Sequence, residues 1–185
     1  MGLYYSKESK PQLIGYVDAE YLSDPHKVQS QMGYVFTYSG KAISWRSVKQ
    51  TMVATSSNHS EILAIHEANR ECVWLKSMIQ HIQETCGLPS IRGNATTLYE
   101  DNVACIAQIK GRFIKGDRIK HISPKFFYTH ELQKKCEIDV QYIRSCNNLV
   151  DLFTKVLPLT TLKKLRYDIG IQRLRDLPIE MLKKS

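Results

Sequence analysis

The chain has 185 residues, of which 43% are hydrophobic, so it can build one compact core but falls short of two ordinary domains. It has no apolar run near the ~18 residues that cross a bilayer and no secretory signal pattern. This excludes an integral membrane protein and predicts an intracellular location, cytoplasmic or nuclear, with no membrane partner. The 26 Lys and Arg residues outnumber the 18 Asp and Glu residues, and the net charge of +8 favours a polyanionic partner.

Three strands and a long helix are predicted in the first part of the chain. Residues 14–19 form a short apolar run between turn-forming residues, and residues 33–48 contain two β-rich segments separated by a Ser-Gly turn, which is typical of a hairpin. Residues 56–86 begin with capping side chains, contain no Gly or Pro and keep apolar residues at helical spacing. Trp45 and Trp74 lie within these regular apolar patterns, which predicts that both rings belong to the core.

The second part of the chain alternates strands with helices, the order that produces parallel strands joined by helical crossovers. Together with the hairpin, this order predicts an α/β fold with a mixed sheet and helices on its faces. The predicted elements are a strand at 96–99, a helix from 101 to 109, a helix from 123 past 132, a strand at 138–143, a helix at 149–156 capped by Asn147 and Asn148, and a helix at 160–167.

The positive charge is concentrated in two stretches. Residues 110–125 contain six basic residues and one acid, and the segment from Lys155 to the C-terminus contains eight basic residues and three acids. A solvated surface is the ordinary explanation of such runs and stays open for the tail. For the first stretch we favour contact with nucleic acid, with Lys115 and Lys120 as candidate substrate-binding residues.

Four carboxylates lie where predicted elements begin or end, at Asp18, Glu61, Asp101 and Asp151. Functional sites in open α/β sheets collect at the carboxyl ends of strands, so Asp18 and Asp101 emerge side by side if their strands are adjacent and parallel. Carboxylates gathered in one cleft repel each other unless they bind divalent cations, and hard oxygen ligands select Mg²⁺ or Mn²⁺. A pair of such ions is suited to phosphodiester cleavage. Taken singly, each acid has a simpler explanation, such as a helix cap at Asp101.

Five segments of the sequence, taken in order, carry a resemblance to a known family. They are YVDAEYLSDP around Asp18, the stretch from Gly33 to Ala68 around Glu61, YEDNVACIAQ around Asp101, IKHISPKFF, and NNLVDLFTKVLP around Asp151. This series resembles the ribonuclease H domain of copia-type LTR retrotransposon Pol polyproteins, over about residues 15–165. The resemblance implies a ribonuclease H-like fold, a five-stranded mixed sheet flanked by helices. It also implies cleavage of the RNA strand of an RNA–DNA hybrid with two Mg²⁺ ions, for which Mn²⁺ can substitute.

The resemblance also assigns roles to individual residues. The four acids match the family's catalytic, metal-binding acids one for one. The family contacts the hybrid just before the helix acid, which here points to Ser56, Ser57 and Asn58, and short polar side chains suit recognition of a 2′-hydroxyl group. The loop 145–148 contains no His, unlike cellular ribonucleases H, so a proton shuttle through that loop is not expected.

The resemblance further suggests how the chain is organised. Residues 1–12 are predicted to be the remnant of a connection to an upstream reverse transcriptase domain, a possible partner. Residues 13–157 are predicted to form the ribonuclease H-like domain, and residues 158–185 a C-terminal helix and basic tail. An alternative to the nuclease is a non-catalytic, nucleic-acid-binding relic of a truncated reverse transcriptase, which would bind a hybrid without cleaving it.

Overall fold

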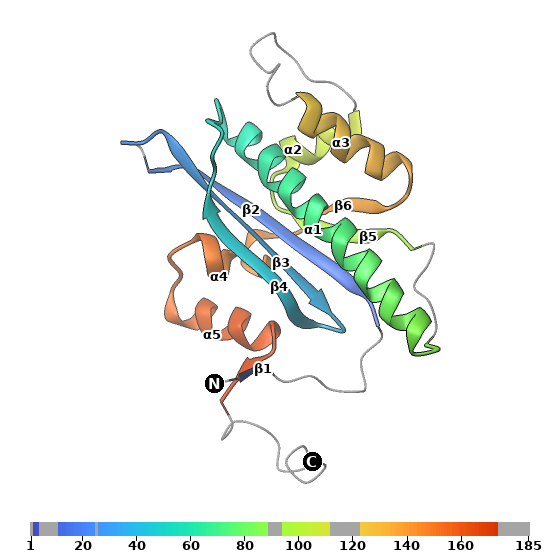
Figure 1. The fold of residues 1–185 in the computed structure, drawn as a ribbon. Coiled ribbons are helices and arrows are strands. Elements are labelled where there is room, and N and C mark those ends of the chain that lie inside the picture. Colours follow the sequence, from blue (N-terminus) through green and yellow to red (C-terminus); the bar gives the residue numbers. More distant parts are fainter. Residues whose placement is uncertain (1, 4–10, 25, 89–93, 112–122, 174–185) are drawn as a thin grey trace.

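A five-stranded mixed sheet forms the centre of the protein (Figure 1). The computed structural model describes residues 2–3, 11–24, 26–88, 94–111 and 123–173. The strand order is β4-β3-β2-β5-β6; β2 pairs antiparallel with β3 and parallel with β5, and β5 pairs parallel with β6. The sheet confirms the predicted fold class. Its strands are β2 (Leu13–Asp24), β3 (Gln29–Tyr38), β4 (Lys41–Lys49), β5 (Thr96–Glu100) and β6 (Ile138–Tyr142).

Helices cover both faces of this sheet. On one face the long α1 (Ser57–Thr85) packs beside α2 (Val103–Gly111) and α3 (Ser123–Lys134). The other face is covered by the short α4 (Asp151–Thr154) and by α5 (Leu159–Asp168). A separate two-stranded pairing joins β1 (Gly2–Leu3) to β7 (Ile171–Gln172). None of the helices described is both long and apolar enough to cross a membrane.

Alternation along the strands divides the core into two layers. In β3, Phe36 belongs to the cluster under α1 and Val35 to the cluster under α5, and both side chains are fully buried. Because both faces of β3 are covered, its sequence from Met32 to Tyr38 is an apolar run interrupted only by Thr37, instead of a strict alternation. The sheet leaves no room for a side chain at Gly15, where an added Cβ atom would lie 2.3 Å from Cδ2 of Leu98 and 2.6 Å from Cε1 of Phe36.

Local signals placed several element boundaries correctly. The hairpin turns at Ser39 and Gly40, whose φ angles of 55° and 75° suit a two-residue turn between right-handed twisted strands. Ser56 caps α1, since its hydroxyl oxygen accepts the backbone N–H of His59 at 3.2 Å. Asn102 caps α2 in the same way through the N–H of Cys105, at 3.0 Å.

Two predictions from the sequence are wrong. Trp45 and Trp74 are 51% and 54% exposed and do not belong to the core. Trp45 lies on β4, an edge strand, where its ring stacks on Phe153 with centroids 6.5 Å apart. The helix predicted at 149–156 is only the four-residue α4. No side chain in the described part of the chain caps it, because the side chain of Asn148 binds elsewhere.

Candidate active site

Three acidic side chains from three separate elements meet at one point of the fold. Asp18 lies within β2, Glu61 begins the second turn of α1, and Asp101 directly follows β5. Because β2 and β5 are parallel neighbours, with Tyr16 opposite Tyr99, the chain brings Asp18 and Asp101 to the same level. One oxygen from each of the three carboxylates lies within 4.8 Å of the others. Asn102 already caps α2, so the carboxylate of Asp101 is not used as a helix cap.

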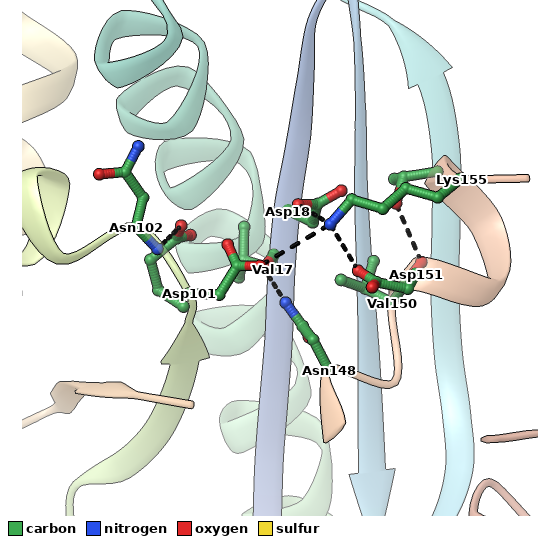
Figure 2. Close-up of polar contacts among 10 residues, drawn as sticks. Val17, Asp18, Asp101, Asn102, Asn148, Val150, Asp151 and Lys155 are labelled. Carbon is green, nitrogen blue, oxygen red and sulfur yellow. Dashed lines mark hydrogen bonds and ion pairs between the residues drawn. The ribbon is translucent and has the colours of Figure 1, made fainter. Parts of the chain in front are cut away.

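The fourth acid approaches from the opposite face of the sheet and joins the others through a lysine (Figure 2). Asp151 begins α4, and Lys155 follows one turn later. The Nζ atom of Lys155 lies 2.9 Å from Oδ1 of Asp151, 3.0 Å from Oδ1 of Asp18 and 3.7 Å from Oδ2 of Asp101. The structure therefore brings Asp18, Glu61 and Asp101 into direct proximity, whereas Asp151 is linked to them by Lys155.

Burial and repulsion between carboxylates raise the pKa values of Glu61 and Asp151. Burial, followed by repulsion from Glu100 and Asp18, raises the pKa of Glu61 well above its usual value. Burial also raises the pKa of Asp151 to about 6, although the nearby Lys155 opposes the change. Burial lowers the pKa of Lys155, but the attraction of Asp18 and Asp151 outweighs it, so the net shift is upward and the ammonium stays charged.

Glu100 adds a fifth carboxylate that the sequence-based site lacked. Its side chain is fully buried, and Oε1 accepts the backbone N–H of Asn102 at 3.0 Å. Burial raises its pKa well above the usual value, helped by repulsion from Asp101 and Asp18. Strand alternation indicated that Glu100 points inward, because it lies on the same face of β5 as Thr96 and Leu98, which are also buried. A charged residue at the last position of a strand is, however, ordinarily predicted to be exposed to solvent.

The donor set fits a divalent cation. Asp18 and Glu61 are only 2% and 5% exposed, yet Oδ2 of Asp18 and Oε2 of Glu61 have no hydrogen-bond partner among the described residues. A buried anionic oxygen without a partner is costly in a protein interior, and a cation removes that cost. Carboxylate oxygens are the ligands that Mg²⁺ and Mn²⁺ prefer.

The first turn of α1 carries the residues predicted to contact a substrate. Ser56 is occupied as the N-cap, Ser57 is exposed, and the amide of Asn58 donates to Oε1 of Gln108 on α2. All three lie within two turns of Glu61 on the same helix. The other predicted contacts, Lys115 and Lys120, lie outside the described residues.

The loop before α4 is anchored beside the acids. The Nδ2 atom of Asn148 donates to the carbonyl oxygen of Val17 at 3.0 Å, and Asn148 is fully buried (Figure 2). Sequence reasoning assigned Asn148 to a helix cap and missed this contact, because it joins residues 131 positions apart.

Solved structures of ribonuclease H share this fold. The N-terminal RNase H domain of a Mycobacterium tuberculosis protein, determined as a fusion with maltose binding protein, matches 85% of this chain and 98% of its own length, with a TM-score of 0.55 and 10% identity. LC11-RNase H1 in complex with an RNA/DNA hybrid matches 77% of this chain and 93% of its own, with a TM-score of 0.53 and 16% identity. The chain therefore has the ribonuclease H fold.

Sequence relatives specify the family further, although no family model matches the chain. It is 33% identical over 150 residues to the retrovirus-related Pol polyprotein from transposon TNT 1-94 of Nicotiana tabacum, over 81% of this chain and 11% of the relative. It is 31% identical over 168 residues to the transposon Ty1-DR1 Gag-Pol polyprotein of Saccharomyces cerevisiae, over 86% of this chain and 9% of the relative. The chain spans about a tenth of these polyproteins. Its sequence and fold place it with the ribonuclease H domains of retrotransposon Pol polyproteins, in agreement with the resemblance to the copia type.

Proposed function

We propose that this chain is a ribonuclease H-type endonuclease that cleaves the RNA strand of RNA–DNA hybrids by two-metal hydrolysis. The observation that carries the proposal is the meeting of Asp18, Glu61 and Asp101, with oxygen atoms within 4.8 Å of one another, in a chain with the ribonuclease H fold. The fold and the Pol relatives support a hydrolase of this class. The positive net charge of +8 suits a polyanionic substrate.

Asp18, Glu61 and Asp101 would hold one divalent ion, and Asp18 with Asp151 would take part in holding a second. When bound, two such ions lower the pKa of the attacking water and stabilise charge on the leaving oxygen. The residues of this chain supply rigid placement, because a β-strand, a long helix and a strand end each fix one carboxylate. A site built on such elements keeps the acids in position before a substrate arrives.

The N-terminal turn of α1 is the proposed contact for the hybrid. Ser57 is exposed there, one turn before Glu61, and the hydroxyl group of Ser56 is placed by its capping bond. Side chains of this kind can donate to or accept from a 2′-hydroxyl group, which distinguishes an RNA strand from a DNA strand. Lys115 and Lys120 are proposed to contact phosphates, and an upstream reverse transcriptase domain is a proposed partner.

A cleavage assay tests the proposal. Purified protein is incubated with an end-labelled RNA–DNA hybrid in Mg²⁺ or Mn²⁺, and with DNA and RNA duplexes of the same sequence. We expect cleavage of the RNA strand of the hybrid alone, lost in Asp101→Asn and kept in Asp139→Asn, which changes the same charge away from the site. Hybrid binding without turnover by folded wild-type protein would instead support the non-catalytic relic.

A further inference from the structure

Lys155 places a positive charge among three of the acids, and it lies closest to Asp18 and Asp151, with Asp101 farther away at 3.7 Å. Its Nζ atom lies 3.0 Å from Oδ1 of Asp18 and 2.9 Å from Oδ1 of Asp151. The geometry is fixed locally, since the backbone N–H of Lys155 also donates to the carbonyl oxygen of Asp151 at 3.1 Å within the short α4. The side chain is 32% exposed, so the ammonium group is held among carboxylates instead of extending into solvent.

The two oxygens of Asp18 have different surroundings. Oδ1 contacts Lys155, whereas Oδ2 is buried and has no hydrogen-bond partner among the described residues. Oε2 of Glu61 is likewise buried without a partner in the described part of the chain. Lys155 therefore neutralises the Asp18–Asp151 pair at close range and contacts Asp101 only at 3.7 Å, whereas one oxygen each of Asp18 and Glu61 is left without a partner among the described residues.

A divalent ion and this ammonium group cannot share the second position. Mg²⁺ lies about 2.0–2.1 Å from its oxygen ligands, so an ion bound between Oδ1 of Asp18 and Oδ1 of Asp151 would overlap the place of Nζ. Two cations that close would also repel strongly in a partly buried site. The lysine has a flexible four-carbon stem, which allows the group to move away.

We infer that Lys155 is a built-in cation for the Asp18–Asp151 half of the site, and that a second divalent ion binds there only by displacing it. The inference rests on the proposed metal-dependent function. The substrate-free protein then binds one ion readily, at Asp18, Glu61 and Asp101. The second ion binds weakly, so the full complement of ions is reached when substrate phosphate oxygens add further ligands. Lys155 is in this sense a positioning residue that sets the order of metal binding.

Calorimetric titration with Mn²⁺, without substrate, tests the inference. We expect one readily saturated site in wild type, and in Lys155→Met a second site that is tighter than in wild type by about tenfold or more, because no bound cation has to leave. Lys155→Arg keeps the charge and should behave like wild type. Lys163→Met removes one exposed lysine of α5 and is the matched control.

The outcomes separate this inference from the proposed function. Identical Mn²⁺ stoichiometry and affinity in wild type and Lys155→Met would overturn the role of Lys155 and leave the nuclease proposal intact. Absence of Mn²⁺ binding in both proteins would count against the proposed function itself. Thermal unfolding in EDTA gives a further check: Lys155→Met should lose stability without metal and regain more of it with Mn²⁺ than wild type gains.

A measurement on the unmutated protein covers the case in which Lys155→Met does not fold. The side-chain ammonium signal of Lys155, assigned by nitrogen-15 NMR, is followed during titration with Mg²⁺. We expect it to stay unchanged while the first ion binds and to shift or disappear at the higher Mg²⁺ concentration at which the second ion binds. A signal that stays constant through saturation of both sites would overturn the inference.

Discussion

The side chain of Asn148 is hydrogen-bonded to the main chain of Val17, at 3.0 Å between Nδ2 and the carbonyl oxygen. Val17 precedes Asp18 in the central strand, and Asn148 precedes α4, which carries Asp151 and Lys155. The contact is fully buried. It holds the last acid of the site at a fixed distance from the first.

Removing this contact should cost both stability and activity. In Asn148→Ala the carbonyl oxygen of Val17 loses its side-chain donor in a buried position, which destabilises by about 1–3 kcal/mol. Because α4 then loses an anchor, hybrid cleavage should fall further than the loss of folded protein explains. Urea unfolding and the cleavage assay measure the two effects. Asn147→Ala is the control, since Asn147 is exposed and bonds to Lys164 at the surface; equal effects in the two variants would contradict the prediction.

Gly33 controls how closely α4 packs on the sheet. A Cβ atom at Gly33 would lie 2.7 Å from Cγ2 of Thr154 and 3.0 Å from Cγ2 of Val150. Gly33→Ala should therefore push α4 away from β3, destabilise by roughly 1–3 kcal/mol and lower cleavage through Asp151. At Gly111 an added Cβ meets no atom of the described residues within 4 Å, so Gly111→Ala is the matched control. If the two variants have the same unfolding curves and cleavage rates, the prediction is wrong and α4 tolerates being moved away from β3.

The crowded carboxylates should make the metal-free protein less stable than a neutralised variant. Asp101 repels both Glu61 and Glu100, and its contact with Lys155 is the longest of the three ion pairs, at 3.7 Å. Asp101→Asn should therefore raise the free energy of unfolding in EDTA by about 1 kcal/mol while cleavage disappears. With Mg²⁺ added, wild type should recover the difference. A destabilised Asp101→Asn protein in EDTA would show that attraction to Lys155 outweighs the repulsion.

His66 should make stability depend on pH independently of the acids. Burial, and then repulsion from Lys125, lowers the pKa of His66 from 6.5 to about 4. As the pH falls, His66 therefore binds a proton near pH 6.5 in the unfolded chain but only near pH 4 in the folded protein. The contribution of neutral His66 to the free energy of unfolding is complete above pH 6.5 and is lost as the pH falls towards 4. Because the ring is only partly buried, the loss is on the order of 1 kcal/mol at pH 5.

The effect of His66 on stability can be separated from that of Glu61 and Glu100, whose raised pKa values make stability fall as the pH rises. The test compares how the free energy of unfolding changes with pH in wild type and in a variant without the histidine. The free energy of unfolding is measured at pH 7.5 and pH 5 for wild type and for His66→Phe, which keeps a ring against Tyr128. Wild type should lose about 1 kcal/mol more than the variant over this interval. Parallel changes in the two proteins would rule out His66 as the titrating group.

The sequence alone determined the elements and the order of the acids. Helical spacing and strand alternation are local properties of the chain, so the hairpin, α1 and β5 could be placed without a structure, and the ordered motifs around Asp18, Glu61, Asp101 and Asp151 pointed to the family. Burial was harder to predict: the apolar patterns around Trp45 and Trp74 do not show that one residue lies on an edge strand and that both rings are exposed.

The tertiary structure decided how the acids are connected. Nothing in the local pattern of NNLVDLFTKVLP indicates that Lys155 reaches Asp18 or that Asn148 binds Val17. The contacts of Lys155 and Asn148 join segments far apart in the sequence, and they form only because parallel pairing of β2 with β5 and packing of α4 on β3 bring the segments together. The spacing of apolar residues indicates where each helix or strand lies, because it is a local property of the chain. Which charged side chains come into contact depends on how one element packs on another.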